Sequence, residues 1–171
     1  VWVPFNEGWG QVDAKRIAQE VKKIDPTRLV DHASGWHDQN GPDFKSIHKY
    51  IFEVKKPRKL NNRPFILSEF GGYSYNIEHH VWDYDHSFGY RMFSSSQSLT
   101  DAYENLIRDQ ILPLVSEGLC ATIYTQLSDV ELEVNGLITY DRAVEKMERL
   151  VVQSLNKELI ASLNQTNGKS Q

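Results

Sequence analysis

The sequence is poor in the features that mark several large classes of protein. Cys120 is the one cysteine among 171 residues, which excludes an internal disulfide framework. No apolar run reaches the roughly 20 residues that a transmembrane helix needs, so we expect no membrane segment. The net charge is −4 and no basic stripe is present, which argues against nucleic acid as the main partner.

The sequence also lacks an initiator methionine and the charged and apolar regions of a signal peptide. It starts with the apolar segment VWVPF, so we expect the chain to be a piece of a longer protein. Its compartment stays open between cytoplasm, periplasm and secretion. The composition, 40% hydrophobic and 25% charged, is that of one soluble globular domain. We expect this domain to cover residues 1–163, followed by a polar, disordered tail at 164–171.

Short apolar runs alternate along the chain with segments of helical periodicity. The apolar runs lie at residues 1–5, 29–30, 44–51, 64–67 and 120–125, and the helical segments at 12–24, 99–117 and 143–163. This alternation is typical of parallel βα units. Two architectures fit it, a doubly wound open sheet and part of a (β/α)8 barrel.

The ends of the apolar runs favour the barrel. No glycine-rich dinucleotide fingerprint and no P-loop follows any of them, which weakens the doubly wound alternative. Several runs instead end in charged, polar or aromatic residues, as barrel strands do when their carboxyl ends carry catalytic side chains. We therefore predict an α/β fold, a partial (β/α)8 TIM barrel with five parallel strands.

Two of these strand ends share one pattern, in which an apolar run, a small polar residue and a glutamate are followed by glycine. The segments are FNEG, which contains Glu7, and LSEFG, which contains Glu69. In a parallel barrel both carboxylates would face the same opening. Retaining glycoside hydrolysis needs such a pair, about 5–5.5 Å apart, with one carboxylate as nucleophile and the other as acid/base. The structural alternative is that both are solvated loop residues.

Four segments carry a resemblance to a known family. FNEGWG, ASGW, SEFGG and YTQLSDVELEVNGLITYDR together resemble glycoside hydrolase family 2, the β-galactosidase and β-glucuronidase family. The resemblance covers nearly the whole chain. It implies that the chain corresponds to strands four to eight of the catalytic barrel with their helices. The first three barrel strands and the preceding β-sandwich domains of that family would then lie outside it.

The resemblance implies a role for each site residue. Glu7 would be the acid/base and Glu69 the nucleophile of a retaining β-glycosidase with a β-glycoside as substrate. Tyr50 would lie beside the nucleophile, and the Asn6 amide would bind the 2-hydroxyl of the sugar. Tyr124 stands near the position where many relatives have a tryptophan that walls the sugar site.

Other features leave alternatives open. Trp36 is a candidate for sugar stacking, with simple packing as the alternative. The aromatic segment 71–98 reads either as a wall of the sugar site or as a separate hydrophobic cluster. Asp129, Glu131 and Glu133 form an acidic segment that either shapes a subsite or solvates a loop.

We predict neither a metal site nor a cofactor, because no histidine follows a structural zinc spacing and only one cysteine is present. A barrel without three strands would expose two sheet edges, through which copies could pair as a homo-oligomer. Such a piece would be inactive alone. The second function class is a non-catalytic carbohydrate-binding or interaction module, which the presence of both glutamates disfavours.

Overall fold

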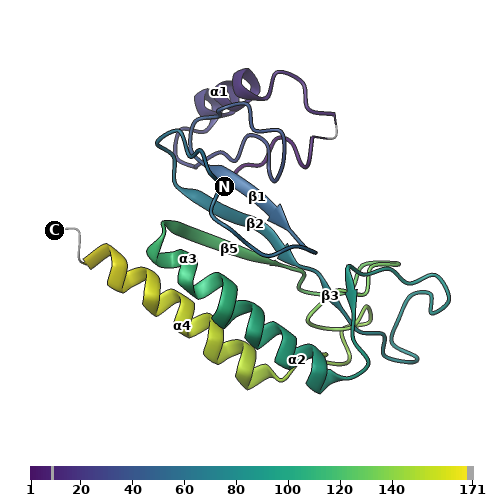
Figure 1. Cartoon of the computed structure of the whole chain (residues 1–171). Coiled ribbons are helices and arrows are strands. Elements are labelled where there is room, and N and C mark those ends of the chain that lie inside the picture. Colours follow the sequence, from purple (N-terminus) through teal and green to yellow (C-terminus); the bar gives the residue numbers. More distant parts are fainter. Residues whose placement is uncertain (9, 169–171) are drawn as a thin grey trace.

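The computed structural model describes residues 1–8 and 10–168, and Figure 1 shows how its elements are arranged. Three parallel strands form the main sheet in the order β1-β2-β5. These are β1 (Lys45–Lys49), β2 (Phe65–Gly71) and β5 (Leu119–Thr125). The central strand β2, FILSEFG, is buried except for partly exposed Glu69. Its unbroken apolar start is therefore explained by cover on both faces.

The remaining elements lie around this sheet. Two short parallel strands, β3 (Tyr73–Ser74) and β4 (Arg91–Met92), form a second sheet. Helix α2 (Ser96–Asn105) continues through the π-helical turn η1 (Leu106–Ile111) into α3 (Leu112–Ser116). This helical segment packs beside α4 (Arg149–Gly168) against the main sheet, whereas α1 (Ala14–Ile24) lies on the other side of the molecule, beyond β1 (Figure 1).

The core lies between β2 and the helices that cover it. Its buried side chains include Phe65, Leu67, Phe70, Leu99, Tyr103, Ile107, Ile111 and Leu155. Burial of an aliphatic or aromatic side chain of this size contributes about 1.5–3 kcal/mol. The packing therefore fixes β2, the strand that carries Glu69, more firmly than any other part of the sheet.

The predicted TIM barrel is wrong, because the sheet is open and contains three strands. The apolar runs at 1–5 and 29–30 do not form strands but meet at two isolated parallel bridges, Trp2 with Val30 and Asn6 with Ser34. Trp2 N–H donates to the Leu29 carbonyl and Asp31 N–H to the Trp2 carbonyl. The next donor of such a ladder would be residue 4, which is proline and has no N–H. Three paired strands cannot supply the closure that eight strands give a barrel.

Several element boundaries also differ from the predictions. The helix expected at 12–24 is confirmed as α1. The helix expected at 143–163 begins only at Arg149, because Thr139 N–H donates to the Val144 carbonyl and Lys146 N–H to the Leu137 carbonyl. These bonds hold the preceding residues in turns. The tail expected at 164–171 continues the backbone of α4 to Gly168, and residues 169–171 lie outside the described part.

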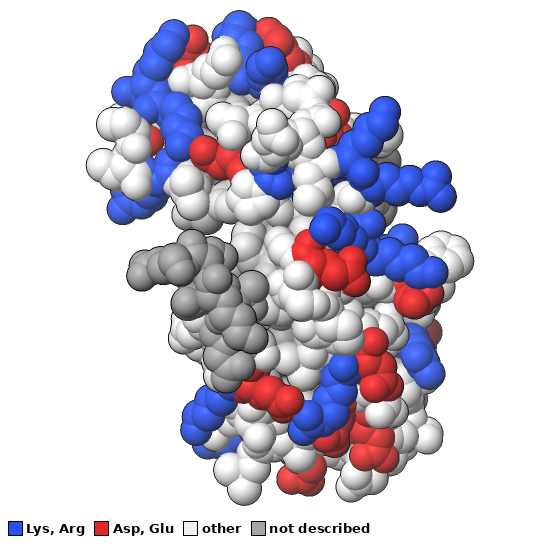
Figure 2. Space-filling view, turned by 60° about the vertical axis from the view of Figure 1, so that its left-hand side comes forward, with Lys and Arg blue, Asp and Glu red and all other residues white. Residues whose placement is uncertain are grey.

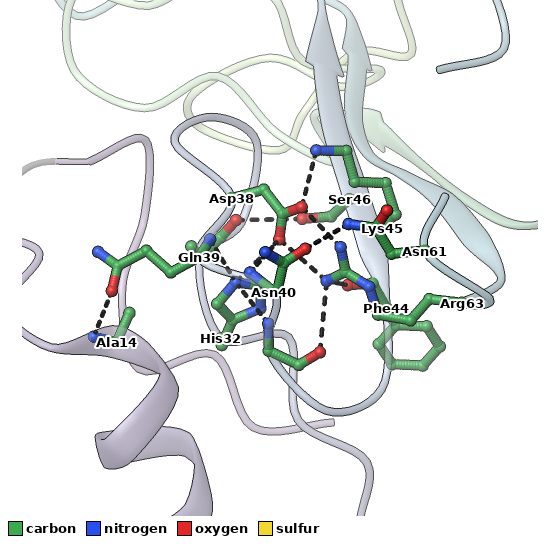
Figure 3. Close-up of polar contacts among 12 residues, drawn as sticks. Ala14, His32, Asp38, Gln39, Asn40, Phe44, Lys45, Ser46, Asn61 and Arg63 are labelled. Atoms are coloured by element: carbon green, nitrogen blue, oxygen red, sulfur yellow. Dashed lines mark hydrogen bonds and ion pairs between the residues drawn. The ribbon is translucent and has the colours of Figure 1, made fainter. Parts of the chain in front are cut away.

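A cluster of polar side chains ties residues of the segment 32–45 to one another and to Arg63 (Figure 3). The buried Arg63 donates from Nη1 and Nη2 to the two carboxylate oxygens of Asp38, at 2.9 and 2.6 Å. Lys45 Nζ donates to the same carboxylate at 3.0 Å. Burial alone would raise the pKa of Asp38, but the hydrogen bonds and charges of Arg63 and Lys45 outweigh it and hold the pKa far below its ordinary range.

We expect Asp38→Asn to lower the free energy of unfolding by about 3 kcal/mol at pH 7, because Arg63 would stay buried without its counter-ion. Asp38 itself keeps 15% of its side chain exposed, so the effect lies at the lower end of the range for buried pairs. Since the folded state lowers this pKa, the contribution is present above the unfolded carboxyl value of about 3.9 and is lost as the pH falls further.

Urea denaturation of wild type and Asp38→Asn between pH 3 and 8 measures this effect. The control is Asp13→Asn, since Asp13 pairs with Arg16 on an exposed surface and its loss should leave the midpoint unchanged. A stability difference that stayed the same at pH 3 and pH 7 would contradict the assignment.

The surface carries charges of both signs. Lysine and arginine are interspersed with aspartate and glutamate on the face shown in Figure 2. Among the described residues, no helix combines the length and the apolar character needed to cross a bilayer.

Candidate active site

A sharp turn directs Glu7 away from its backbone ladder. The N–H of Glu7 donates to the Ser34 carbonyl at 2.8 Å, and the chain then passes through positive φ at Glu7 (51°) and Gly8 (84°). A left-handed conformation costs a non-glycine residue about 1–2 kcal/mol. Glycine is required at position 8, because an added Cβ would lie 2.5 Å from the His37 ring. The fold therefore accepts local strain to place the Glu7 side chain.

A bulge places Glu69. The register between β1 and β2 shifts after the pair of Ile47 and Leu67, so that the next pair is His48 with Glu69 and Ser68 is skipped. A β-bulge of this kind changes the face to which the following side chains point. Glu69 thereby lies beside His48 of the neighbouring strand.

The two glutamates meet at one histidine. His48 Nδ1 lies 2.7 Å from Oε1 of Glu7 and 3.6 Å from Oε2 of Glu69. The side chain of His48 is fully buried, and its Nε2 lies 2.9 Å from Ser34 Oγ. The facing oxygens of Glu7 and Glu69 lie within 4.8 Å of each other. The predicted juxtaposition of the two carboxylates is therefore present without a barrel.

His48 was missed by the sequence analysis, although a signal for it exists. It stands two residues before Tyr50 in the run SIHKY, and side chains two apart in a strand share a face. A site role for Tyr50 therefore implied that residue 48 faces the same way. The hydrogen-bond partner of the Glu7 side chain is this imidazole ring.

Tyr50 contacts the second glutamate, as predicted. Its hydroxyl donates to Oε2 of Glu69, and its ring stacks on Tyr90 with 3.9 Å between centroids and 2° between planes. Burial, followed by the hydrogen bond to Glu69, raises the pKa of Tyr50 well above its ordinary value. Tyr50 is therefore a neutral hydrogen-bond donor at physiological pH.

These groups line one cavity of about 440 Å³. Its walls come from four parts of the chain: the turn at Glu7, the ends of β1 and β2, the segment around Tyr90, and the end of β5 with the residues that follow it. The lining residues are Asn6, Glu7, Tyr50, Ser68, Glu69, Tyr90, Ile123, Tyr124, Thr125, Gln126 and Glu133. This set contains five of the six residues predicted for the site.

The sixth predicted residue, Trp36, does not line the cavity. Its ring lies 6.2 Å from that of His48, and 47% of the residue is exposed. Tyr124 lines the cavity, but its ring packs edge-on against Phe70 and Tyr103. Burial raises the pKa of Tyr124 above its ordinary range. Tyr124 therefore belongs mainly to the hydrophobic core and less to the accessible wall of the cavity.

The segment 71–98 contributes both to the hydrophobic core and to the wall of the cavity. Tyr73 and Phe93 lie against each other with 5.4 Å between ring centroids and join the core, whereas Tyr90 lines the cavity.

The segment after β5 is held by a buried ion pair. Lys146 Nζ donates to Asp129 Oδ1 and to the Val134 carbonyl, both at 2.7 Å, and neither charged side chain is more than 1% exposed. Gly136 N–H also donates to Asp129 Oδ1. Of the acidic residues that the sequence analysis left open, Asp129 is therefore structural, whereas Glu133 faces the cavity.

Glu7, His48 and Glu69 each offer one atom that could coordinate a metal ion. Ligands bound to zinc at about 2.0–2.1 Å stand about 3 Å or more apart, whereas Nδ1 of His48 and Oε1 of Glu7 are 2.7 Å apart. This separation is that of a hydrogen bond. Glu7 and His48 are therefore joined by a hydrogen bond, with Glu69 Oε2 3.6 Å from the same ring nitrogen, and the expectation of no metal stays a prediction.

No protein-family model and no curated protein matches this chain. The resemblance to glycoside hydrolase family 2 therefore remains a prediction from the quoted motifs.

We expect Lys146→Met to lower the free energy of unfolding by about 3–5 kcal/mol, because Asp129 would stay buried without its partner charge. The double variant Asp129→Asn/Lys146→Met should lose less than the sum of the single changes, since it leaves no unpaired charge. Urea denaturation of the four proteins gives the coupling free energy, with exposed Lys157→Met as a control for loss of a lysine. Additive single and double effects would show that the pair does not hold this segment.

Proposed function

We propose that this chain carries the catalytic carboxylates of a retaining β-glycosidase that hydrolyses O-glycosidic bonds, a role in carbohydrate metabolism. The observation that carries the proposal is the pair Glu7 and Glu69, whose facing oxygens lie within 4.8 Å across one cavity. Retaining enzymes hold their carboxyl groups about 5–5.5 Å apart, whereas inverting enzymes need about 6.5–9.5 Å for a water molecule. The motif resemblance supports the β-glycoside class and the assignment of roles.

Glu69 is the nucleophile in this proposal. The Tyr50 hydroxyl donates to Oε2 of Glu69, and the buried His48 ring lies 3.6 Å from the same oxygen, so these two groups orient the carboxylate. In the first step an oxygen of Glu69 bonds to the anomeric carbon while the bond to the leaving oxygen breaks.

Glu7 is the acid/base. In the first step its proton passes to the glycosidic oxygen as that oxygen leaves. In the second step the Glu7 carboxylate takes a proton from water, whose oxygen bonds to the anomeric carbon while the bond to Glu69 breaks. His48 contacts Oε1 of Glu7 and so leaves Oε2 for this exchange. Asn6 lines the same cavity, and in this proposal its amide binds the 2-hydroxyl of the sugar.

Azide rescue in the full-length protein distinguishes the two roles. Glu69→Ala should abolish turnover of aryl β-glycosides, and azide should restore it with a glycosyl azide of inverted anomeric configuration as product. Glu7→Ala should retain the first step for substrates with very good leaving groups, because these need little protonation. Azide should rescue this variant with retained configuration.

Exposed Glu78→Ala is the matched control and should behave as wild type, since Glu78 lies outside the cavity. Interchanged rescue products would reverse the roles of the two glutamates. A wild-type protein that leaves a panel of aryl β-glycosides intact, yet binds them, would support the carbohydrate-binding module instead.

A further inference from the structure

A third carboxylate, Glu133, lies in the wall of the same cavity. Its backbone is fixed from two sides. Glu133 and Val130 exchange two backbone hydrogen bonds, at 2.9 and 3.0 Å, and the neighbouring residues Leu132 and Val134 bond to Phe88. The buried pair of Asp129 and Lys146 holds the same segment. Glu133 is therefore carried by a pre-organised turn.

The side chain of Glu133 is held by neutral groups. Its Oε2 accepts from Gln126 Nε2 at 3.1 Å and from Asn135 Nδ2 at 3.4 Å. Gln126 Nε2 also donates to Asn135 Oδ1 at 2.6 Å, and Asn135 is completely buried. Amides orient a carboxylate without cancelling its charge. Glu133 therefore presents a negative charge in a defined position.

The cavity as a whole is negative. Three of its lining residues, Glu7, Glu69 and Glu133, are carboxylic acids, and none of the described lining residues is lysine or arginine. Tyr90 lies within this field: burial raises its pKa, and the charges of Glu7, Glu133 and Glu69 raise it further. A substrate with a carboxylate of its own would meet repulsion from at least one fixed charge besides the catalytic pair.

A sugar hydroxyl suits this site better. A hydroxyl that donates to a carboxylate forms a charge-assisted hydrogen bond, which is about twice as strong as a bond between neutral groups. Uncharged hexoses offer several such donors, whereas uronic acids replace one of them with a carboxylate.

We propose that Glu133 is a specificity-determining residue, which accepts a hydrogen bond from a hydroxyl group of an uncharged sugar and excludes sugars that carry a carboxylate. The inference deepens the proposed glycosidase function and rests on it for the identity of the site. It selects neutral β-glycosides over β-uronides as the substrate class.

Binding of non-hydrolysable ligands tests this inference without turnover. The probes are a matched pair of aryl 1-thio-β-glycosides, one of glucose and one of glucuronic acid, with a second pair of galactose and galacturonic acid. Calorimetric titration of the full-length protein at low salt should give a Kd at least about tenfold lower for the neutral member of a pair. Because Glu133 is exposed to solvent, the ratio of the uronide Kd to the neutral-sugar Kd should fall as salt is raised.

Glu133→Gln should narrow that ratio by about three- to tenfold, through weaker binding of the neutral sugar and stronger binding of the uronide. Glu131→Gln is the control, because Glu131 belongs to the same turn but does not line the cavity, and it should leave the ratio unchanged. Asn135→Ala is the second variant, for the case that Glu133→Gln does not fold. It removes an amide that orients Glu133 and should also narrow the ratio.

Three results would overturn the inference. They are tighter binding of a uronide than of its neutral partner, a Kd ratio unchanged in both Glu133→Gln and Asn135→Ala, and no binding of any probe. Selective binding of the neutral probes without hydrolysis of the corresponding O-glycosides would leave the inference standing and reject the glycosidase function. The two failures are therefore distinguishable.

Discussion

Two carboxyl groups held close together are the constraint on which the site depends. If both carboxylates were ionised, their repulsion at 4.8 Å, the upper limit of the separation of their facing oxygens, would be about 3–4 kcal/mol for an effective dielectric constant of about 20. Two neighbours oppose this repulsion: His48 lies between the carboxylates, and Tyr50 donates to Glu69. The proposed acid/base and nucleophilic roles require one carboxyl group to be protonated while the other is ionised.

The scaffold supports this pair by rigid attachments on each side. The packed helices hold β2 and with it Glu69, and the turn through positive φ holds Glu7. Two buried ion pairs, Asp38 with Arg63 and Asp129 with Lys146, fasten the segments next to β1 and β5. These pairs replace hydrogen-bonded strands in the parts of the chain where regular sheet is absent. Side chains on such fixed backbone lose little entropy when a ligand binds.

The prediction of which residues lie together in the cavity was closer to the structure than the prediction of the fold. Glu7 and Glu69 could be paired because both follow apolar runs in the same sequence pattern, although a left-handed turn places the one and a bulge in β2 the other. The barrel prediction failed because an apolar run does not reveal whether its backbone finds a continuous partner, and Pro4 interrupts the ladder with residues 30–34. His48 and the contrast between Glu133 and Asp129 depend on tertiary neighbours, which no local pattern contains. The late start of α4 has the same origin.

Covalent trapping tests the central claim most directly. A 2-deoxy-2-fluoro β-glycoside of a neutral sugar, with a good leaving group, should inactivate the full-length protein, because the fluorine slows hydrolysis of the glycosyl intermediate more than its formation. Peptide mass spectrometry should then find one deoxyfluoroglycosyl group, attached to Glu69. A label on any other residue, or turnover of the parent glycoside with inversion at the anomeric carbon, would contradict the account.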